Sequence, residues 1–164
     1  MNRTLVIARH TKSSWKEIGM LDFDRPLKKD RINDAENIST KLKSLGLTPD
    51  LILSSPAMRT KQTAEIFCRN LNYDFQNVQF DKRIYEASVE DVLKTIEQAD
   101  AEVKTLLLIG HNPSLTDFVN CFLEATIENL PTTGVVWFDL ETDDWNLDKT
   151  TRMNFKFFLT PKTI

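Results

Sequence analysis

The most apolar run of the chain is Leu106–Ile109, and Gly110-His111-Asn112-Pro113 follows it directly. A short apolar run without alternation is typical of a strand that is buried on both faces of a parallel sheet. Asn112 is expected to cap a helix, with Pro113 as its first residue. Apolar side chains then recur at helical spacing, at Leu115, Phe118, Val119 and Phe122. This strand–turn–helix unit predicts an α/β fold.

The same kind of unit recurs along the chain. Further strands are predicted at Thr4–Ala8, Leu51–Leu53, Val78–Phe80 (weakly), Val135–Leu140 and Met153–Leu159. Helices are predicted over 35–45, with Gly46 at the C-cap, and over 89–96. A third helix is predicted over 56–71, with Ser55 as its N-cap and Pro56 as its first residue. Because strands alternate with helices, we expect a three-layer α/β/α sandwich with a mostly parallel central sheet. The last two strands lack an intervening helix, which favours an antiparallel edge, and the acids from Glu141 to Asp148 are expected in a solvated loop between them.

Composition and charge limit the class of protein. The chain has 164 residues, 41% of them hydrophobic and 27% charged, which fits a single globular domain over residues 1–164. The net charge of −3 argues against general nucleic-acid binding. No apolar run is long enough to span a membrane, and the N-terminus lacks the apolar core of a signal peptide. Cys68 and Cys121 fall in apolar helical stretches, where we expect small buried side chains, and the whole composition suggests a cytoplasmic protein.

Chemically competent side chains gather at the predicted strand ends. Arg9 and His10 follow the first strand, Arg59 lies one turn into the helix after the second, and His111 follows the most apolar strand. Ligands of open α/β sheets bind at the carboxyl ends of strands. Two guanidiniums and two helix N-termini, near Ser55 and Asn112, suit an anion, and phosphate is the leading candidate. A histidine beside it can act as nucleophile or as acid/base.

Other kinds of site have less support. The two histidines lack the neighbouring ligands of a metal site, and the chain contains no P-loop, no G-x-G-x-x-G and no G-x-S-x-G motif. Ser54 and Ser55 are expected to be loop and cap residues rather than catalysts. Lys12, Ser13 and Trp15 follow the first strand and could line the site, but a structural or solvent-facing role is favoured.

The motifs at these positions resemble those of the histidine phosphatase superfamily, also called phosphoglycerate mutase-like. Within it, the chain is similar to the small SixA-type phosphohistidine phosphatases. The resemblance runs through nearly the whole chain in ordered segments, which are 5–10, 24–27 with Ala35, 53–60 with 62–64, 83–86, 110–114 and 130–134. It implies a phosphoglycerate mutase-like fold.

The resemblance also implies roles for individual residues. His10 matches the nucleophile that takes the phosphoryl group, and Arg9, Arg59 and His111 match the residues that bind it. Glu86 matches the acid/base of the mutase branch, although SixA-like relatives do not all keep that carboxylate. The sequence departs from the family pattern at Thr11 and at Arg31, where glycines are usual. Arg31 is expected to be a surface change.

The implied reaction has two steps without metal or cofactor: His10 attacks phosphorus, and water hydrolyses the phosphohistidine. The attacking nitrogen must be unprotonated, so the other ring nitrogen is expected to donate to a backbone carbonyl. His111, if protonated, would add a third cation. Short segments between the motifs leave no room for a large lid, which favours phosphohistidine on a phosphorelay or phosphotransfer protein as substrate. The alternatives are a phosphomonoesterase or mutase acting on a small metabolite, and a module that binds phosphoproteins without turnover.

Overall fold

A computed structural model describes residues 1–16 and 18–164. Its strands are β1 (Asn2–Arg9), β2 (Leu51–Ser54), β3 (Gln79–Phe80), β4 (Thr105–Gly110), β5 (Val135–Glu141) and β6 (Asn154–Leu159). Its α-helices are α1 (Ile32–Ser44), α2 (Met58–Leu71), α3 (Val89–Glu97) and α4 (Ser114–Asn120). Short 3₁₀ turns are η1 (Asp22–Asp24), η2 (Lys29–Arg31), η3 (Phe75–Asn77) and η4 (Lys82–Ile84). Within the described ranges, no helix is long and apolar enough to cross a membrane.

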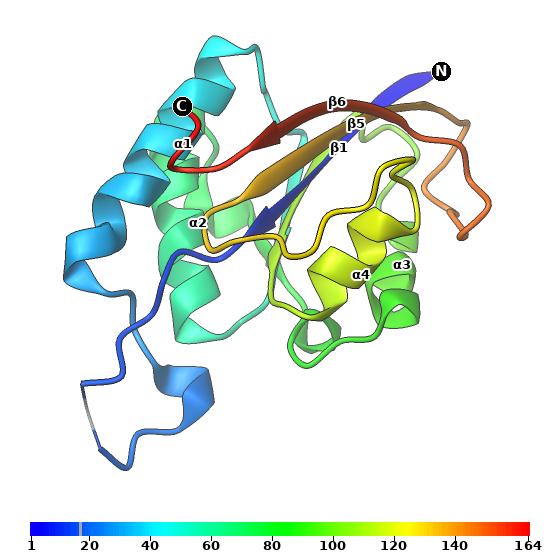
Figure 1. Cartoon of the computed structure of the whole chain (residues 1–164). Coiled ribbons are helices and arrows are strands. Elements are labelled where there is room, and N and C mark those ends of the chain that lie inside the picture. Colours follow the sequence, from blue (N-terminus) through cyan, green and yellow to red (C-terminus); the bar gives the residue numbers. More distant parts are fainter. Residues whose placement is uncertain (17) are drawn as a thin grey trace.

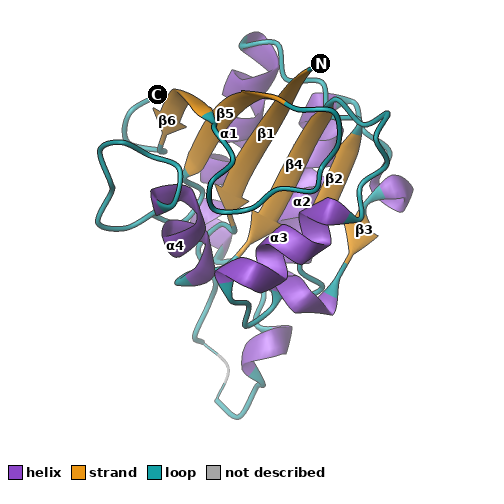
Figure 2. Cartoon of the chain, turned by 90° about the vertical axis from the view of Figure 1, so that its right-hand side faces the viewer, coloured by secondary structure: helices purple, strands orange, loops and turns teal. Residues whose placement is uncertain are grey.

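The strands form one mixed sheet in the order β3-β2-β4-β1-β5-β6 (Figure 2). The four strands that alternate with helices, β1 to β4, pair in parallel. β5 and β6 have no helix between them and add an antiparallel edge. The predicted fold class and the antiparallel edge are therefore confirmed.

Helices cover both faces of the sheet, with α1 and α2 on one side and α3 and α4 on the other (Figure 1). The central strand β4 shows why its sequence is continuously apolar. Leu107 and Ile109 pack in the cluster with α1 and α2, whereas Leu106 and Leu108 pack in the cluster with α3 and α4. All four side chains are fully buried, as a strand between two helical layers requires.

A long loop, of which residues 12–16 and 18–31 are described, leaves the carboxyl end of β1 and projects from the body of the molecule before α1 begins (Figure 1). Its two limbs are held together at the base by backbone hydrogen bonds from Ser14 N to Pro26 O and from Lys28 N to Lys12 O, both 2.8 Å long. An isolated antiparallel bridge joins Ser13 to Leu27 between them. The loop therefore has a defined base. Arg31, at its end, is exposed as expected.

Both proline-containing helix starts were predicted too early. Ala57 is extended and precedes the first residue of α2, because Ser55 Oγ accepts a hydrogen bond from Ala57 N (3.2 Å) before the helix begins. α4 begins at Ser114, after Pro113. Asn112 still caps a backbone amide of that helix, since its Oδ1 accepts from Thr116 N at 3.2 Å.

Two further expectations need correction. Cys68 is buried in α2, but Cys121 is exposed just after α4, because that helix ends at Asn120. The acids between β5 and β6 are exposed as predicted, yet the loop is not wholly solvated. Trp145 and Leu147 turn into the core, and Trp145 Nε1 donates to Val103 O at 2.7 Å. The loop therefore closes one end of the hydrophobic core.

Candidate active site

The carboxyl ends of β1, β2 and β4 bring the predicted site residues together. His10 N donates to Gly110 O at 3.0 Å, which fixes the residue after β1 against the end of β4. The rings of His10 and His111 lie with their centroids 5.2 Å apart. Both rings and the side chain of Arg59 are buried, with residue exposures of 6–7%. Burying two imidazoles beside a guanidinium costs folding free energy unless a ligand or other polar groups form hydrogen bonds with them.

His10 has the protonation state that nucleophilic attack requires. Its Nδ1 lies 2.7 Å from Thr11 O, and a carbonyl oxygen only accepts, so Nδ1 carries the proton. This confirms the expected backbone partner and leaves Nε2 with a free electron pair. Burial lowers the pKa of His10 to about 4; the hydrogen bond to Thr11 raises the pKa, and repulsion from Arg59, Arg9 and Arg25 lowers it further. The ring is therefore neutral at pH 7.

His111 is held by Ser55 in the same neutral form, with the ring proton on Nδ1. His111 Nε2 lies 2.7 Å from Ser55 Oγ. Because that oxygen already accepts from Ala57 N, we assign its hydroxyl proton to Nε2, which places the ring proton on Nδ1. Nδ1 is buried and has no hydrogen-bond partner among the described residues. Burial lowers the pKa of His111 to about 3, with repulsion from the protonated form of His10 and from Arg59 adding to it, so the free protein lacks the third cation considered above.

Arg9 is directed at the site by the turn before β5. Its Nη1 donates to Leu130 O at 3.0 Å, while its Nε is buried without a hydrogen-bond partner in the described part of the chain. Burial lowers the pKa of the Arg9 guanidinium, and repulsion from Arg59 lowers it further. Two guanidiniums that repel one another, one of them with an unused buried donor at Nε, provide the electrostatics of an anion site.

Arg59, in the first turn of α2, is engaged by the long loop. Its Nη1 donates to Asp22 O at 2.8 Å and its Nη2 to Asp22 Oδ2 at 3.0 Å. Tyr85 OH donates to the same carboxylate oxygen at 2.7 Å, and Arg25 pairs with the other oxygen at 2.9 Å. Burial raises the pKa of Asp22, but the hydrogen bonds from Tyr85, Arg25 and Arg59 outweigh it and lower the pKa to about 2. Asp22 is thus an anion beside the guanidinium of Arg59.

Glu86 lies at the rim of the same site. It is exposed and lines a cavity of about 330 Å³ together with Asp22, Arg59, Tyr85 and His111. Its backbone has φ +54°, a left-handed conformation that non-glycine residues adopt uncommonly. The structure therefore brings Glu86 to the entrance, outside the buried cluster.

Thr11 replaces the usual glycine of the family and is buried in a hydrogen-bond network. Its backbone amide donates to Thr63 Oγ1 of α2 at 3.0 Å, and its hydroxyl accepts from Thr133 Oγ1 at 3.0 Å. Thr133, with φ +62°, donates its own amide to Arg9 O and His10 O at 3.2 and 3.0 Å. The hydrogen bonds of Thr11 and Thr133 therefore fix the backbone around His10.

The partners of the predicted residues were missed from the sequence. Ser55 was interpreted only as a cap and loop residue, although it also orients His111. Tyr85 stands beside Glu86 in a family-like segment, which was its only signal. Leu130 lies in the family-like segment 130–134, which gave its carbonyl no role, and Asp22 carries no sequence signal, because these groups meet Arg9 and Arg59 only in the folded chain.

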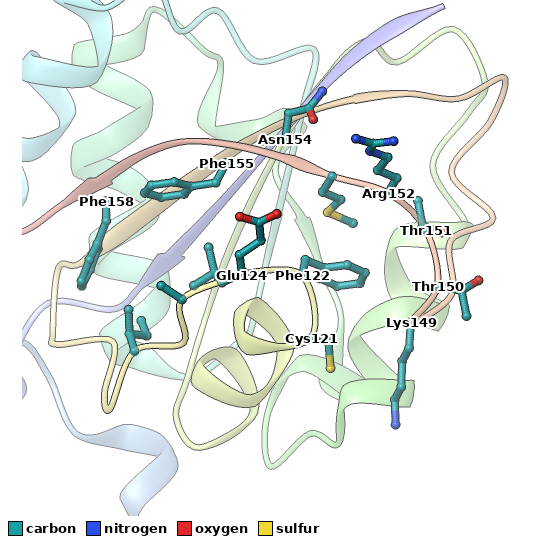
Figure 3. Close-up of a pocket in the computed structure, with 14 residues that line it drawn as sticks. Cys121, Phe122, Glu124, Lys149, Thr150, Thr151, Arg152, Asn154, Phe155 and Phe158 are labelled. Atoms are coloured by element: carbon teal, nitrogen blue, oxygen red, sulfur yellow. The ribbon is translucent and has the colours of Figure 1, made fainter.

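A separate cavity of about 820 Å³ lies between β6 and the residues that follow α4 (Figure 3). Phe122, Phe155 and Phe158 line it together with Lys149 and other residues, but none of the predicted site residues does. Within residues 1–16 and 18–164, no group of three or more His, Cys, Asp or Glu side chains is placed to hold a metal ion.

The fold and the matching motifs define the class of protein. The model of the histidine phosphatase superfamily, branch 1, matches residues 5–105, and the chain belongs to that family. The matched stretch contains Arg9, His10, Arg59 and Glu86, whereas His111 lies beyond it.

Individual relatives and solved structures are similar to most of the chain. An uncharacterized chloroplastic protein of Arabidopsis thaliana is 31% identical over 136 residues, which is 78% of this chain and 62% of the relative. An uncharacterized protein of Mycobacterium tuberculosis is 28% identical and covers 81% of this chain and 91% of its own length. The crystal structure of a candidate phosphohistidine phosphatase SixA from Agrobacterium tumefaciens has a TM-score of 0.82 and 29% identity, covering 97% of this chain and 98% of that one. The protein histidine phosphatase SixA complexed with tungstate has a TM-score of 0.81 at 20% identity, over 97% of both chains. Membership of the histidine phosphatase superfamily supports phosphatase activity, whereas the structure at 20% identity shows the fold alone.

Proposed function

We propose that the chain is a phosphatase that works through a covalent phosphohistidine at His10, and that its substrate is phosphohistidine on a phosphorelay or phosphotransfer protein. One observation carries the proposal. Arg9 Nε and His111 Nδ1, the latter carrying the ring proton assigned above, are buried and have no hydrogen-bond partner among the described residues, and the rings of His10 and His111 lie with their centroids 5.2 Å apart. A buried donor without an acceptor costs about 1–3 kcal/mol, and a phosphoryl group supplies three acceptor oxygens.

The geometry supports a two-step transfer. The Nε2 electron pair of His10 forms a bond to phosphorus, and the bond from phosphorus to the substrate nitrogen breaks, its electron pair leaving with the protonated imidazole. Water then attacks phosphorus, the bond to Nε2 breaks, and inorganic phosphate is released. Arg9, Arg59 and the Nδ1 proton of His111 stabilise the charge on the phosphoryl oxygens in both steps.

Three features support the choice of substrate. The imidazole of phosphohistidine leaves readily once protonated, so the reaction needs little from an acid at the position of Glu86. The cavity of about 330 Å³ is lined by Arg59 and His111, two of the residues that would bind the phosphoryl group. The structural relatives at TM-scores above 0.8 include the SixA proteins described above. A cytoplasmic role in signal transduction and a single phosphatase domain over residues 1–164 belong to the same proposal.

The test is a turnover panel with wild type and His10→Ala. The substrates are a protein phosphorylated on histidine, a sugar phosphate and an aryl phosphate. Wild type is expected to release phosphate fastest from phosphohistidine, and His10→Ala is expected to be inactive on all three. Turnover of phosphohistidine by His10→Ala would end the proposal.

A trapping experiment separates the enzyme from a binding module. Quenching during turnover should leave a phosphoenzyme that is labile to acid and stable to base. Because the chain has only two histidines, the matched variant His111→Asn should still be labelled while His10→Ala should not. If no phosphoenzyme forms and the protein only binds phosphohistidine, the non-catalytic alternative holds.

Glu86 is the observation that favours a second candidate function. Its place in the wall of the cavity, beside Tyr85 and His111, would allow it to protonate an alkoxide leaving group. A phosphomonoesterase or mutase acting on a small metabolite would then prefer the sugar phosphate in the same panel.

A further inference from the structure

The loop between β1 and α1 presents three large apolar side chains to solvent. Trp15 is 76% exposed, Ile18 103% and Leu21 71%. Of the large hydrophobic side chains in the described ranges, no other is more than 54% exposed. Isolated exposed apolar residues are ordinary, but three within seven residues of one loop are typical of an interaction surface.

The loop holds one of these side chains, Trp15, in place. Arg25 is only 8% exposed and donates to Asp22 Oδ1 at 2.9 Å, to Ser13 Oγ at 2.5 Å and to Ser14 O at 3.2 Å. Its guanidinium carbon lies 3.1 Å from the centre of the Trp15 ring, so the indole rests on a fixed cation and still faces solvent. A surface that is ordered before binding loses less conformational entropy when a partner arrives.

Two of the exposed side chains, Leu21 and Trp15, are connected to the candidate active site. Leu21 directly precedes Asp22, whose carboxylate is bound to Arg59 and Tyr85. Trp15 reaches the same carboxylate through Arg25. A macromolecule that places a phosphoryl group at His10 would therefore meet this loop.

We propose that Trp15, Ile18 and Leu21 form a docking surface for a folded phosphoprotein, which packs an apolar patch beside its phosphorylated side chain against the loop. The inference rests on the proposed phosphatase function and extends it to the recognition of the carrier protein. A metabolite small enough for the 330 Å³ cavity gains nothing from apolar groups outside that cavity. Among the described residues of the loop, the exposed bases Lys12, Lys16, Lys29 and Arg31 outnumber the exposed acids Asp22, Asp24 and Asp30 by one, and two of these lysines flank Trp15 at positions 12 and 16. The partner is therefore expected to carry acidic residues around its apolar patch.

The experiment compares two substrates with the same leaving group. One is the free amino acid phosphohistidine, and the other is a histidine phosphotransfer domain phosphorylated with phosphoramidate. The variants are Ile18→Ser/Leu21→Ser and Trp15→Ser. The control is Phe155→Ser/Ile164→Ser, because these side chains are 50% and 44% exposed and lie far along the chain on β6 and at the C-terminus. KM and kcat are measured separately, and circular dichroism checks the fold of each variant.

For Ile18→Ser/Leu21→Ser and for Trp15→Ser, KM for the phosphorylated domain is expected to rise about tenfold, the size of effect that an interface anchor has. Turnover of free phosphohistidine is expected to stay within about twofold of wild type, as is every parameter of the control. Equal losses on both substrates, or no loss on the phosphorylated domain, would overturn the docking proposal. So would a wild-type dimer, seen by sedimentation velocity, that Ile18→Ser/Leu21→Ser converts to monomer. Failure of the phosphatase proposal is distinguishable, because wild type itself would then release no phosphate from free phosphohistidine.

Discussion

The carboxylate of Asp22 pairs with the guanidinium of Arg59 at 3.0 Å, although 37 residues separate them in the chain. The oxygen of this pair, Asp22 Oδ2, also accepts a hydrogen bond from Tyr85 OH at 2.7 Å. A loop residue therefore places a negative charge on the cation that is proposed to bind the phosphoryl group. Asp22 both orients Arg59 and competes with an incoming anion for it.

Asp22→Asn tests the balance between these two effects. Asparagine keeps an oxygen that accepts from Tyr85 or Arg59 but removes a like charge from the neighbourhood of bound phosphate. We expect inorganic phosphate to bind about fivefold more tightly, since one such charge at the protein surface is worth on the order of 1 kcal/mol. Isothermal titration calorimetry measures it, with Asp24→Asn as the matched control on the same turn. Weaker binding would show instead that orientation of Arg59 dominates.

The two histidines make stability fall as the solution becomes acidic. Both have a folded-state pKa, about 4 and about 3, below the ordinary value of 6.5. Between pH 6.5 and 5 the unfolded chain therefore binds protons that the folded chain does not, and the free energy of unfolding decreases as the pH falls. Each histidine contributes a slope that grows from about 0.7 kcal/mol per pH unit at pH 6.5 toward about 1.4 at pH 5, as the unfolded imidazole becomes fully protonated. Urea unfolding at pH 7, 6 and 5 measures the slope, and His111→Gln should reduce it by about half.

Nuclear magnetic resonance checks the same protonation states directly. With only two histidines, both rings can be followed by their ¹⁵N and ¹³C shifts. We expect neither ring to titrate between pH 7.5 and 5.5, with the proton on Nδ1 in both. A ring that titrates near 6.5 would contradict the assignment. Added phosphate should raise the pKa of His111, because a bound anion favours the imidazolium.

Ser55→Ala removes the hydroxyl that orients His111. The hydrogen bond between Ser55 Oγ and His111 Nε2 is 2.7 Å long, and without it Nδ1 is no longer fixed as the donor. We expect phosphate affinity to fall about tenfold, close to the value of one buried hydrogen bond. Ser54→Ala is the control, because Ser54 is equally buried and its hydroxyl donates to Ser55 O. Equal losses in both variants would show a general structural effect.

Gly134→Ala tests the support of Arg9. A Cβ at Gly134 would lie 2.8 Å from Pro131 O and 3.0 Å from Leu130 Cδ1, so the turn that carries Leu130 O would have to move. Because Leu130 O holds Arg9 Nη1, phosphate affinity should fall together with stability, the latter by about 1–3 kcal/mol. Calorimetry and thermal unfolding measure the two effects. Gly110→Ala, whose Cβ meets a side-chain methyl of Ile84 at 2.9 Å, should reduce phosphate affinity less.

Glu86→Gln distinguishes the leaving groups. We expect turnover of an alkyl phosphate to fall by about 10²-fold or more, the size of a general-acid contribution, and turnover of phosphohistidine to stay within about threefold. Steady-state assays on both substrates measure the effect, with Glu97→Gln on the exposed face of α3 as control. Indifference of the alkyl phosphate reaction would remove Glu86 from the chemistry.

Some predictions from the sequence were wrong where local patterns compete with tertiary structure. Ser55-Pro56 has the composition of a helix start, but α2 begins only at Met58. The hydroxyl of Ser55 forms a hydrogen bond with His111 instead. Cys121 follows an apolar helical pattern, but the helix stops one residue before it. The loop between β5 and β6 is acidic, and only the fold shows that Trp145 closes the core.

The sequence by itself determined the α/β class, the parallel strands and the gathering of Arg9, His10, Arg59 and His111 at one sheet edge. It could do so because buried strands have continuous apolar runs, and parallel strands end on the same side. Only the tertiary structure decided which atoms are free to bind an anion. The partners that set this, Ser55 for His111, Asp22 for Arg59 and Leu130 for Arg9, lie 56, 37 and 121 residues away along the chain. No local pattern records such contacts, because they arise only when separate segments pack against one another and exclude water from the groups between them.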